Sequence, residues 1–166
     1  MRILGIDPGS RVTGFGCVDF DRDRASYVDA GVIRTKGDDF NERLNQIFSG
    51  VHRLVDGLEP DAVAIEQVFV ARNASSALKL GAARSAAICA TFERAPELAE
   101  YAPRAIKQAV TGTGAATKEQ VAHMVRALLG LKVELTADAS DALAVAICHG
   151  NSMQLQSKLA RMGGRS

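Results

Sequence analysis

The opening of the chain most limits its possible folds, because three strand-like segments follow one another with only short links. Residues 2–6 form an apolar run, and residues 14–20 and 27–34 alternate between apolar and polar side chains. Residues 8–11, Pro-Gly-Ser-Arg, have the composition of a turn. These segments predict an antiparallel meander, so the fold must contain a sheet that begins with these strands.

The rest of the chain alternates between helical and strand patterns. Apolar residues recur at steps of three and four over residues 39–58, as in an amphipathic helix, and the run at 62–65 is typical of a buried parallel strand. The last helix is apolar on nearly every side from Ala142 to Cys148, which predicts that it is buried. The other elements are expected as a helix over 73–95, a strand over 98–102, helices over 103–110 and 117–129, and a final helix from about Asp138.

This order predicts one α/β domain with a mixed five-stranded sheet flanked by helices. A chain of 166 residues is too short for two full-sized domains. We expect the domain to occupy residues 1–150 and residues 151–166 to form a basic, flexible tail. Because Asp7 interrupts the first apolar run and no run of about 18 apolar residues follows, we expect no membrane segment and a cytoplasmic location.

Four acidic residues lie where a site could form. Asp7 and Glu66 each follow an apolar strand directly, and ligand sites form at the carboxyl ends of strands. Asp138 and Asp141 are three residues apart, so they share one face of the last helix. Because unpaired, partly buried carboxylates are costly, a divalent cation is the simplest counterion. Taken singly, each acid could instead be a helix cap or a strand-end turn residue.

Both the acids and the distribution of charge suit a protein that acts on a polyanion. Mg²⁺ prefers oxygen ligands, and two such ions can hold the attacking and leaving oxygens of a displacement at phosphorus. Residues 1–67 carry 8 basic and 12 acidic groups, whereas residues 68–133 carry 9 and 4. An acidic first half beside a basic middle region could hold cations on one surface and phosphates on another.

Four short motifs follow one another in order and are spread along nearly the whole chain. They are Gly-Ile-Asp-Pro-Gly-Ser-Arg-Val-Thr-Gly at 5–14, Ile-Glu-Gln-Val-Phe at 65–69, Asn-Ala-Ser-Ser-Ala-Leu-Lys-Leu-Gly at 73–81 and Ala-Asp-Ala-Ser-Asp-Ala-Leu-Ala at 137–144. In sequence and spacing they resemble the RuvC family of bacterial Holliday junction resolvases. The resemblance implies a ribonuclease-H-like fold and Mg²⁺-dependent resolution of four-way DNA junctions by paired, symmetric nicks, in homologous recombination and DNA repair.

The resemblance also implies partners, metals and site residues. It implies a homodimer, a branch-migration helicase complex as partner, and two Mg²⁺ ions per active site, with Mn²⁺ as an expected substitute. Asp7, Glu66, Asp138 and Asp141 match the family's metal-binding acids. Some relatives have His at the third of these positions, and Asp138 makes the set fully acidic here.

Basic residues and one aromatic residue are candidate DNA contacts. Lys107 and Lys118 lie on the two helices after the last strand and match the family's active-site lysines, although both could simply lie on solvated helix faces. Phe69 resembles the aromatic residue that opens the junction by stacking on a base, although it could instead pack in the core. Further candidates for phosphate contact are Arg72, Lys79 and Arg104.

The long helix over residues 73–94 is the candidate dimer interface. Small side chains give it faces that a second helix could approach closely, namely Ala82, Ala83, Ala86, Ala87 and Ala90. Burial of the same stripe against the chain's own sheet is the alternative interpretation.

Two other functions fit parts of the sequence. Asp7, Gly9 and Gly14 have the spacing of the first phosphate loop in actin-like and sugar-kinase-like ATPases, but 166 residues cannot supply the two related domains of that class. A junction-binding protein of the same fold that has lost its chemistry is disfavoured because all four acids are present.

Overall fold

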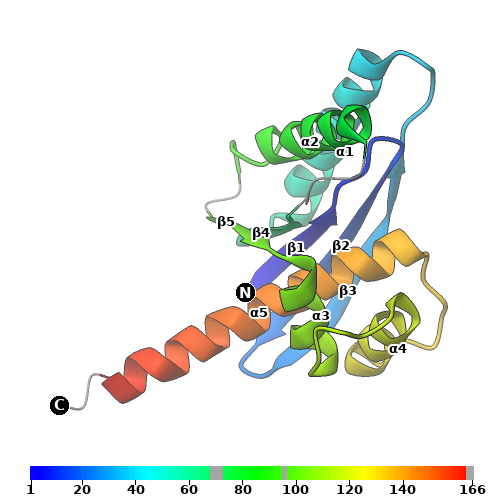
Figure 1. Ribbon diagram of the computed structural model, residues 1–166. Coiled ribbons are helices and arrows are strands. Elements are labelled where there is room, and N and C mark those ends of the chain that lie inside the picture. The colour runs from blue at the N-terminus through cyan, green and yellow to red at the C-terminus, as the bar shows by residue number, and fades with distance from the viewer. Residues whose placement is uncertain (68–72, 95–96, 164–166) are drawn as a thin grey trace.

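The computed structural model describes residues 1–67, 73–94 and 97–163, and the elements follow the predicted order (Figure 1). Phe69 and Arg72 lie outside the described residues. The elements are β1 (Arg2–Asp7), β2 (Val12–Asp21), β3 (Arg24–Arg34), α1 (Phe40–Leu58), β4 (Ala62–Glu66), α2 (Ala74–Cys89), β5 (Glu97–Tyr101), α3 (Pro103–Thr111), α4 (Lys118–Leu129) and α5 (Ala137–Gly163).

In the part of the chain that the structure describes, five strands form one mixed sheet in the order β3-β2-β1-β4-β5. The first three strands pair antiparallel, which confirms the predicted meander. β4 then pairs with β1 in parallel, and β5 pairs with β4 in parallel. The carboxyl ends of β1, β4 and β5 therefore lie at one edge of the sheet.

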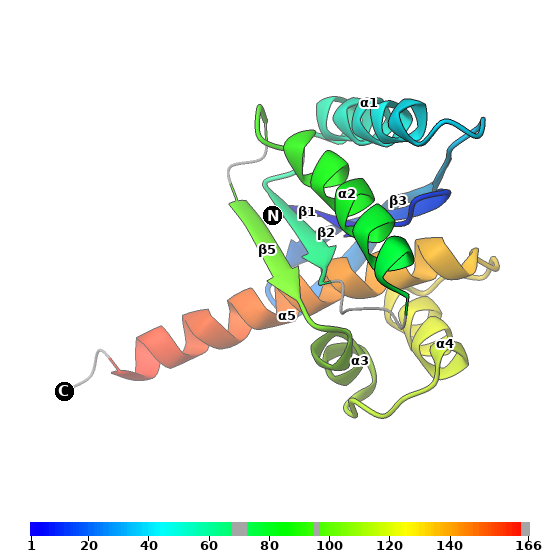
Figure 2. The same cartoon turned by 45° about the horizontal axis from the view of Figure 1, so that its top comes forward.

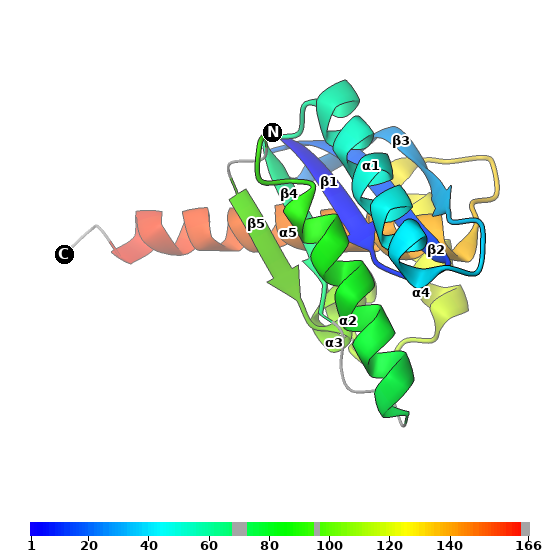
Figure 3. The ribbon, with the colours of Figure 1, turned by 90° about the horizontal axis from the view of Figure 1, so that it is seen from above.

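Helices cover both faces of the sheet, with α1 and α2 on one side and α3, α4 and α5 on the other (Figures 1 and 3). Side chains of β1 alternate between the two layers. Leu4 and Ile6 are fully buried in the cluster under α1 and α2, and Ile3 is fully buried in the cluster under α5. This alternation follows from the two-residue repeat of a strand.

The helix α5 is buried over its first half, as its apolar sequence predicted. Residues from Ala142 to Cys148 are at most 4% exposed. The helix then continues beyond the edge of the sheet (Figures 1 and 2). Residues 151–163, which the sequence predicts as a flexible tail, continue α5 as a helix in the structure. They contain no Pro, and no Gly before Gly163, to interrupt it. Gln154 of this segment donates a hydrogen bond to the Arg22 carbonyl in the β2–β3 turn at 2.9 Å.

The predicted dimer stripe on α2 is buried within the chain's own fold. Ala83 and Ala87 are fully buried and Ala90 is 2% exposed, all in the cluster with α1 and the sheet. Ala86 packs partly against the same cluster, and Ala82 is half-buried. The assignment of Ala83, Ala87 and Ala90 to a dimer interface is therefore wrong, because their small side chains let α2 pack closely inside the monomer.

The described residues include no helix long and apolar enough to cross a membrane.

Candidate active site

The ends of two neighbouring strands place two acids side by side. Ile6 of β1 pairs with Ile65 of β4 in parallel register, so the residues that follow them, Asp7 and Glu66, are neighbours at the same edge. Both side chains are half-buried, and the negative charge of Glu66 contributes to raising the pKa of Asp7. This confirms the predicted placement of both residues at a carboxyl edge of the sheet.

The first turns of α5 bring Asp138 and Asp141 to the same edge. Asp7 lies opposite Gly14 in the β1–β2 pair, and a Cβ atom at Gly14 would collide with the backbone of Asp138. A Cβ atom at Gly5 would likewise collide with the backbone of Ala142. The absence of these side chains allows α5 to begin directly over the strand ends. Both α5 acids are half-buried.

Three of the four acids line a continuous cleft. One part, about 340 Å³ in volume, is lined by Asp7, Glu66, Lys118 and Asp141 together with Leu80 and other residues. The adjoining part, about 210 Å³, shares Glu66, Lys118 and Asp141 and adds Lys107. Asp138 lines neither part, although its negative charge contributes to raising the pKa of Asp7. The fold thus brings the four predicted acids and both predicted lysines to one region.

The carboxylates of this cluster destabilise one another's charge. Burial is the largest cause of the raised pKa of Asp7, which reaches about 7, and the negative charges of Glu66 and Asp141 add to it. Burial and the charge of Asp141 also raise the pKa of Glu66. Such a cluster favours the binding of protons or other cations.

Lys118 is the basic residue that compensates these acids most directly. Its Nζ atom donates to Oδ2 of Asp141 at 2.9 Å, and this hydrogen bond, with the Asp141 charge, raises the pKa of the Lys118 ammonium. A capping box fixes the start of α4 at this point: Thr117 Oγ1 accepts from the Gln120 amide, and Gln120 Oε1 accepts from the Thr117 amide. This capping box places Lys118 in the first turn of α4.

The donor chemistry of the cleft fits a hard divalent cation. The cleft-lining residues offer carboxylate oxygens and include no Cys or His, and such oxygen ligands suit Mg²⁺. Within residues 1–67, 73–94 and 97–163, no three Asp, Glu, His or Cys side chains already form a metal-binding group. The four acids are neighbours, but their side chains are not arranged as a complete set of metal ligands. Lys118 forms an ion pair with one of them, Asp141.

Comparison with known proteins assigns the family. The family model described as crossover junction endodeoxyribonuclease RuvC matches residues 3–149. The chain belongs to this family. It is 53% identical over 161 residues to the crossover junction endodeoxyribonuclease RuvC of Methylococcus capsulatus, with 97% of each protein covered. It is 50% identical over 163 residues to the RuvC of Tolumonas auensis, with 98% of this chain and 92% of that protein covered.

Solved RuvC structures share the fold. The Thermus thermophilus RuvC structure superposes with a TM-score of 0.84 at 35% identity, covering 94% of this chain and 97% of that one. Thermus thermophilus RuvC in complex with a Holliday junction substrate superposes with a TM-score of 0.87, also at 35% identity, covering 94% and 96%. The expected ribonuclease-H-like fold is thereby confirmed.

The other described basic residues that this RuvC-family chain is predicted to use for DNA binding lie in or near the cleft. Lys107 of α3 is half-buried and lines the cleft beside Glu66. Arg104, on the first turn of α3, is exposed, and its aliphatic part lies against Gly114 outside the cleft. Lys79, on α2, is also exposed, next to the cleft residue Leu80.

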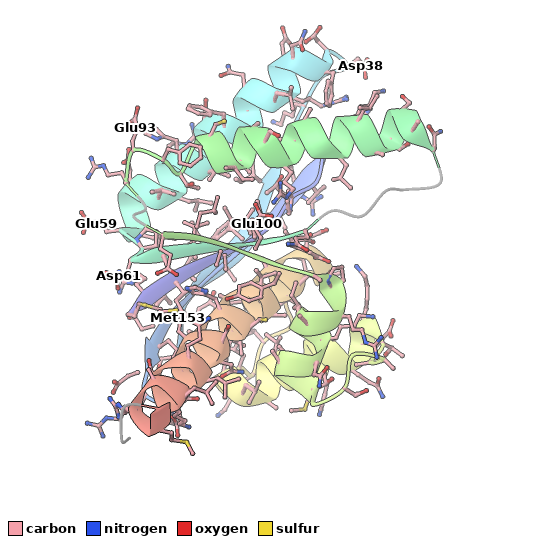
Figure 4. The ribbon with its side chains drawn as sticks, turned by 60° about the vertical axis from the view of Figure 1, so that its left-hand side comes forward. Asp38, Glu59, Asp61, Glu93, Glu100 and Met153 are labelled. Atoms are coloured by element: carbon pink, nitrogen blue, oxygen red, sulfur yellow. The ribbon has the colours of Figure 1, made fainter. Side chains whose placement is uncertain are left out.

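Sequence reasoning missed Arg84 as a support of the RuvC-family cleft. Arg84 Nε donates to the backbone carbonyl of Glu66 at 3.4 Å, and its Nη2 atom forms an ion pair with Glu100 at 2.7 Å. Figure 4 shows Glu100 on β5, on the side that α2 covers. Arg84 therefore ties α2 to the ends of β4 and β5. The sequence offers one signal of this role: Arg84 is a single cation among small residues of α2, and such a cation needs an acidic or carbonyl partner.

Another cleft, about 500 Å³ in volume, lies away from the acid cluster. It is formed by the β2–β3 turn and the second half of α5, and its lining includes Arg22 and Met153. Its lining contains one carboxylate, that of Asp23. We place the candidate active site at the smaller cleft because the acids and lysines gather there.

Proposed function

We propose that this chain resolves Holliday junctions as a metal-dependent endodeoxyribonuclease. The observation that carries the proposal is the family match over residues 3–149, which includes all four acids. Three of these acids line one cleft, and Asp138 is near enough to act on the pKa of Asp7. The Thermus thermophilus relative of known structure is bound to a Holliday junction substrate. We assign the nuclease to residues 1–150, and action on chromosomal DNA in recombination and repair places it in the bacterial cytoplasm.

Asp7, Glu66, Asp138 and Asp141 would hold the metal, as two Mg²⁺ ions with Mn²⁺ as a substitute. When bound, the ions would neutralise charge on the scissile phosphate and lower the pKa of the attacking water. The protein's own contribution is to set the acids around one cleft at the strand ends. There, burial and mutual repulsion make the cluster attractive to cations.

The lysines and the other basic residues would hold the DNA. Lys107 and Lys118 both line the cleft, so either ammonium can reach a phosphate there and stabilise developing negative charge. Phosphate contacts would set affinity and its salt dependence. On the strength of the family resemblance, Phe69 would stack on an unpaired base, while Arg72, Lys79 and Arg104 would contact the DNA backbone.

The active species would be a homodimer, because a junction has two equivalent strands to cut and a two-fold dimer presents one site to each. With part of the alanine stripe buried, the exposed face of α2 is the better candidate interface. Leu78 is 75% exposed, Ala82 is half-buried, and Ser85 and Cys89 are exposed along the same face. The exposed Phe92 follows at the end of this helix. A branch-migration helicase complex is the partner that family membership suggests.

A cleavage assay tests the function. Labelled four-way junction and matched linear duplex are incubated with the protein in Mg²⁺ and in EDTA. We expect paired nicks in the junction only, and only with Mg²⁺. Asp7→Asn should abolish cleavage and leave junction binding largely intact, whereas Asp38→Asn, an exposed acid remote in sequence from the four, should cut normally.

Three results would contradict the proposal. Cleavage by Asp7→Asn at the wild-type rate would remove Asp7 from the metal site. Tight junction binding without cleavage in Mg²⁺ would indicate a binding protein, and ATP turnover without DNA would indicate the kinase-like alternative.

A further inference from the structure

We propose that the Lys118 ammonium acts as a built-in counterion that competes with the divalent ion for the carboxylate cluster. When the metal binds, Lys118 is displaced from Asp141 and becomes available to a DNA phosphate. The inference rests on the proposed function only in taking the cluster as the metal site. The new element is the position of the Lys118 ammonium before and after the divalent ion binds.

The Lys118 ammonium lies directly against the carboxylate cluster. Lys118 Nζ lies 2.9 Å from Oδ2 of Asp141, and Lys118 lines both parts of the cleft together with Glu66 and Asp141. Within the described residues, this is the only ion pair made by any of the four acids. A metal ion that used the same Asp141 oxygen would lie about 2 Å from it and would face the ammonium directly. Two cations at one carboxylate oxygen repel each other and compete for its lone pairs, so binding of the ion should weaken the contact between Lys118 and Asp141.

The Lys118 side chain can leave Asp141 while the fold stays in place. The Lys118 side chain is 74% exposed, whereas the Asp141 side chain is only 19% exposed. The backbone of Lys118 is held by the Thr117–Gln120 capping box, which does not involve its ammonium. The ammonium can therefore turn towards solvent or a phosphate on a flexible four-carbon stem, while Asp141 stays where α5 places it.

Lys107 lines the same cleft as Lys118 and serves as its comparison. Lys107 also lines the cleft beside Glu66, but within the described part of the chain it forms no ion pair with a carboxylate. Both lysines add one positive charge to the same region. Only Lys118 occupies an oxygen that the metal would use, so direct competition is separable from general electrostatic repulsion.

The test measures binding of Mg²⁺, and of Mn²⁺ as a spectroscopic probe, to the protein without DNA. Titration calorimetry and Mn²⁺ electron paramagnetic resonance give the affinity for the wild type, Lys118→Met, Lys118→Arg and Lys107→Met. We expect Lys118→Met to bind the ions about 2- to 5-fold more tightly, in the range set by a partly exposed ion pair. Lys118→Arg should stay close to the wild type, and Lys107→Met should change affinity less than Lys118→Met.

A second readout follows the lysine itself. The ¹H–¹⁵N signal of the Lys118 ammonium should be visible in the metal-free wild type, where Asp141 holds it, and should be lost or shifted when Mg²⁺ is added. Asp141→Asn should remove the signal without metal. Circular dichroism and thermal unfolding confirm that each variant is folded.

The outcomes separate the inference from the proposed function. Unchanged or weaker metal binding by Lys118→Met, or an equal gain from Lys107→Met, overturns the competition while the metal site stands. Absence of ion binding by the wild type and by all variants overturns both the metal site and the competition.

Discussion

Asp7 lies in an environment that disfavours the charged form of its carboxyl group. Its carboxyl is held at a strand end beside Glu66, and its pKa is raised to about 7 by burial and by neighbouring carboxylates. Lys118 counters this effect only in part, because its direct partner is Asp141. In the metal-free protein at neutral pH, ionised Asp7 therefore destabilises the fold. This is the electrostatic reason why the cluster should bind cations.

The free energy of unfolding of metal-free Asp7→Asn tests whether ionised Asp7 destabilises the fold. Because the pKa of Asp7 in the folded protein lies above its unfolded value of 3.8, the contribution of Asp7 to wild-type stability falls as the pH rises from about 4 to about 7. In EDTA at pH 8, Asp7→Asn should raise the free energy of unfolding by at most about 4 kcal/mol, which corresponds to that change in pKa. Near pH 4 the gain should nearly vanish. Urea unfolding at both pH values measures it, with Asp38→Asn as the control, and an equal effect at both pH values would refute the interpretation.

The packing of α5 on β1 and β2 positions half of the acid cluster. Gly5 and Gly14 lie on the face of the sheet that α5 covers, and at each of them a side chain would collide with the helix backbone. Gly16 similarly faces Leu143. Because the colliding atoms at Gly5 and Gly14 belong to the backbone, they cannot turn aside as the end of a long side chain can. The helix approaches the sheet closely enough to bring Asp138 and Asp141 over the strand ends.

Replacing Gly5 with Ala should therefore destabilise the fold. Overpacking typically costs about 1–3 kcal/mol, and we expect Gly5→Ala to lie at the upper end because the collision is with Ala142 and Ala146 of α5. Gly57→Ala in α1 is the matched control, since nothing lies within 4 Å of its new Cβ atom. It should gain about 0.5 kcal/mol from the helix propensity of Ala. Urea unfolding measures both, and equal stability of the two variants would exclude the packing argument.

The molecule as a whole leaves one face of α2 exposed while the opposite face is buried. Ala83 and Ala87 pack inside the monomer, whereas Leu78 and Phe92 are 75% and 67% exposed. Exposed apolar side chains along one helix face are typical of an interface between proteins. A homodimer through this face would explain their exposure. It would also provide the two sites that symmetric nicking requires.

Sedimentation of Leu78→Glu tests the dimer. The Glu side chain at position 78 would bury a charge in the helix contact between the two subunits. We expect this variant to be a folded monomer that resolves junctions poorly. Ser76→Glu, which changes another exposed position on the first turns of α2, should remain dimeric. Analytical ultracentrifugation at micromolar concentration gives the mass of each. A wild type that sediments as a 17.6 kDa monomer and still nicks both strands in one binding event would contradict the dimer.

The sequence by itself determined the elements and the residues of the acid cluster. Strand alternation, helix periodicity and the Thr117–Gln120 capping box depend on neighbours within a few residues, so they can be recognised without the fold. Asp7 and Glu66 could be placed together because each ends a strand of the same sheet. The contact between Gln154 and the Arg22 carbonyl could not be recognised in this way, because it joins residues far apart in sequence.

Only the tertiary structure decided which face of α2 is buried and which basic residue meets the acids. Alanines lie on several sides of α2, so its sequence offers no clear contrast between an inner and an outer face. Lys118 and Asp141 are 23 residues apart, and Arg84 is 18 residues from Glu66. Such pairs form only when packed helices and strand ends fix both partners in space. Local sequence therefore identifies the chemical groups, and the packing of distant segments determines their partners.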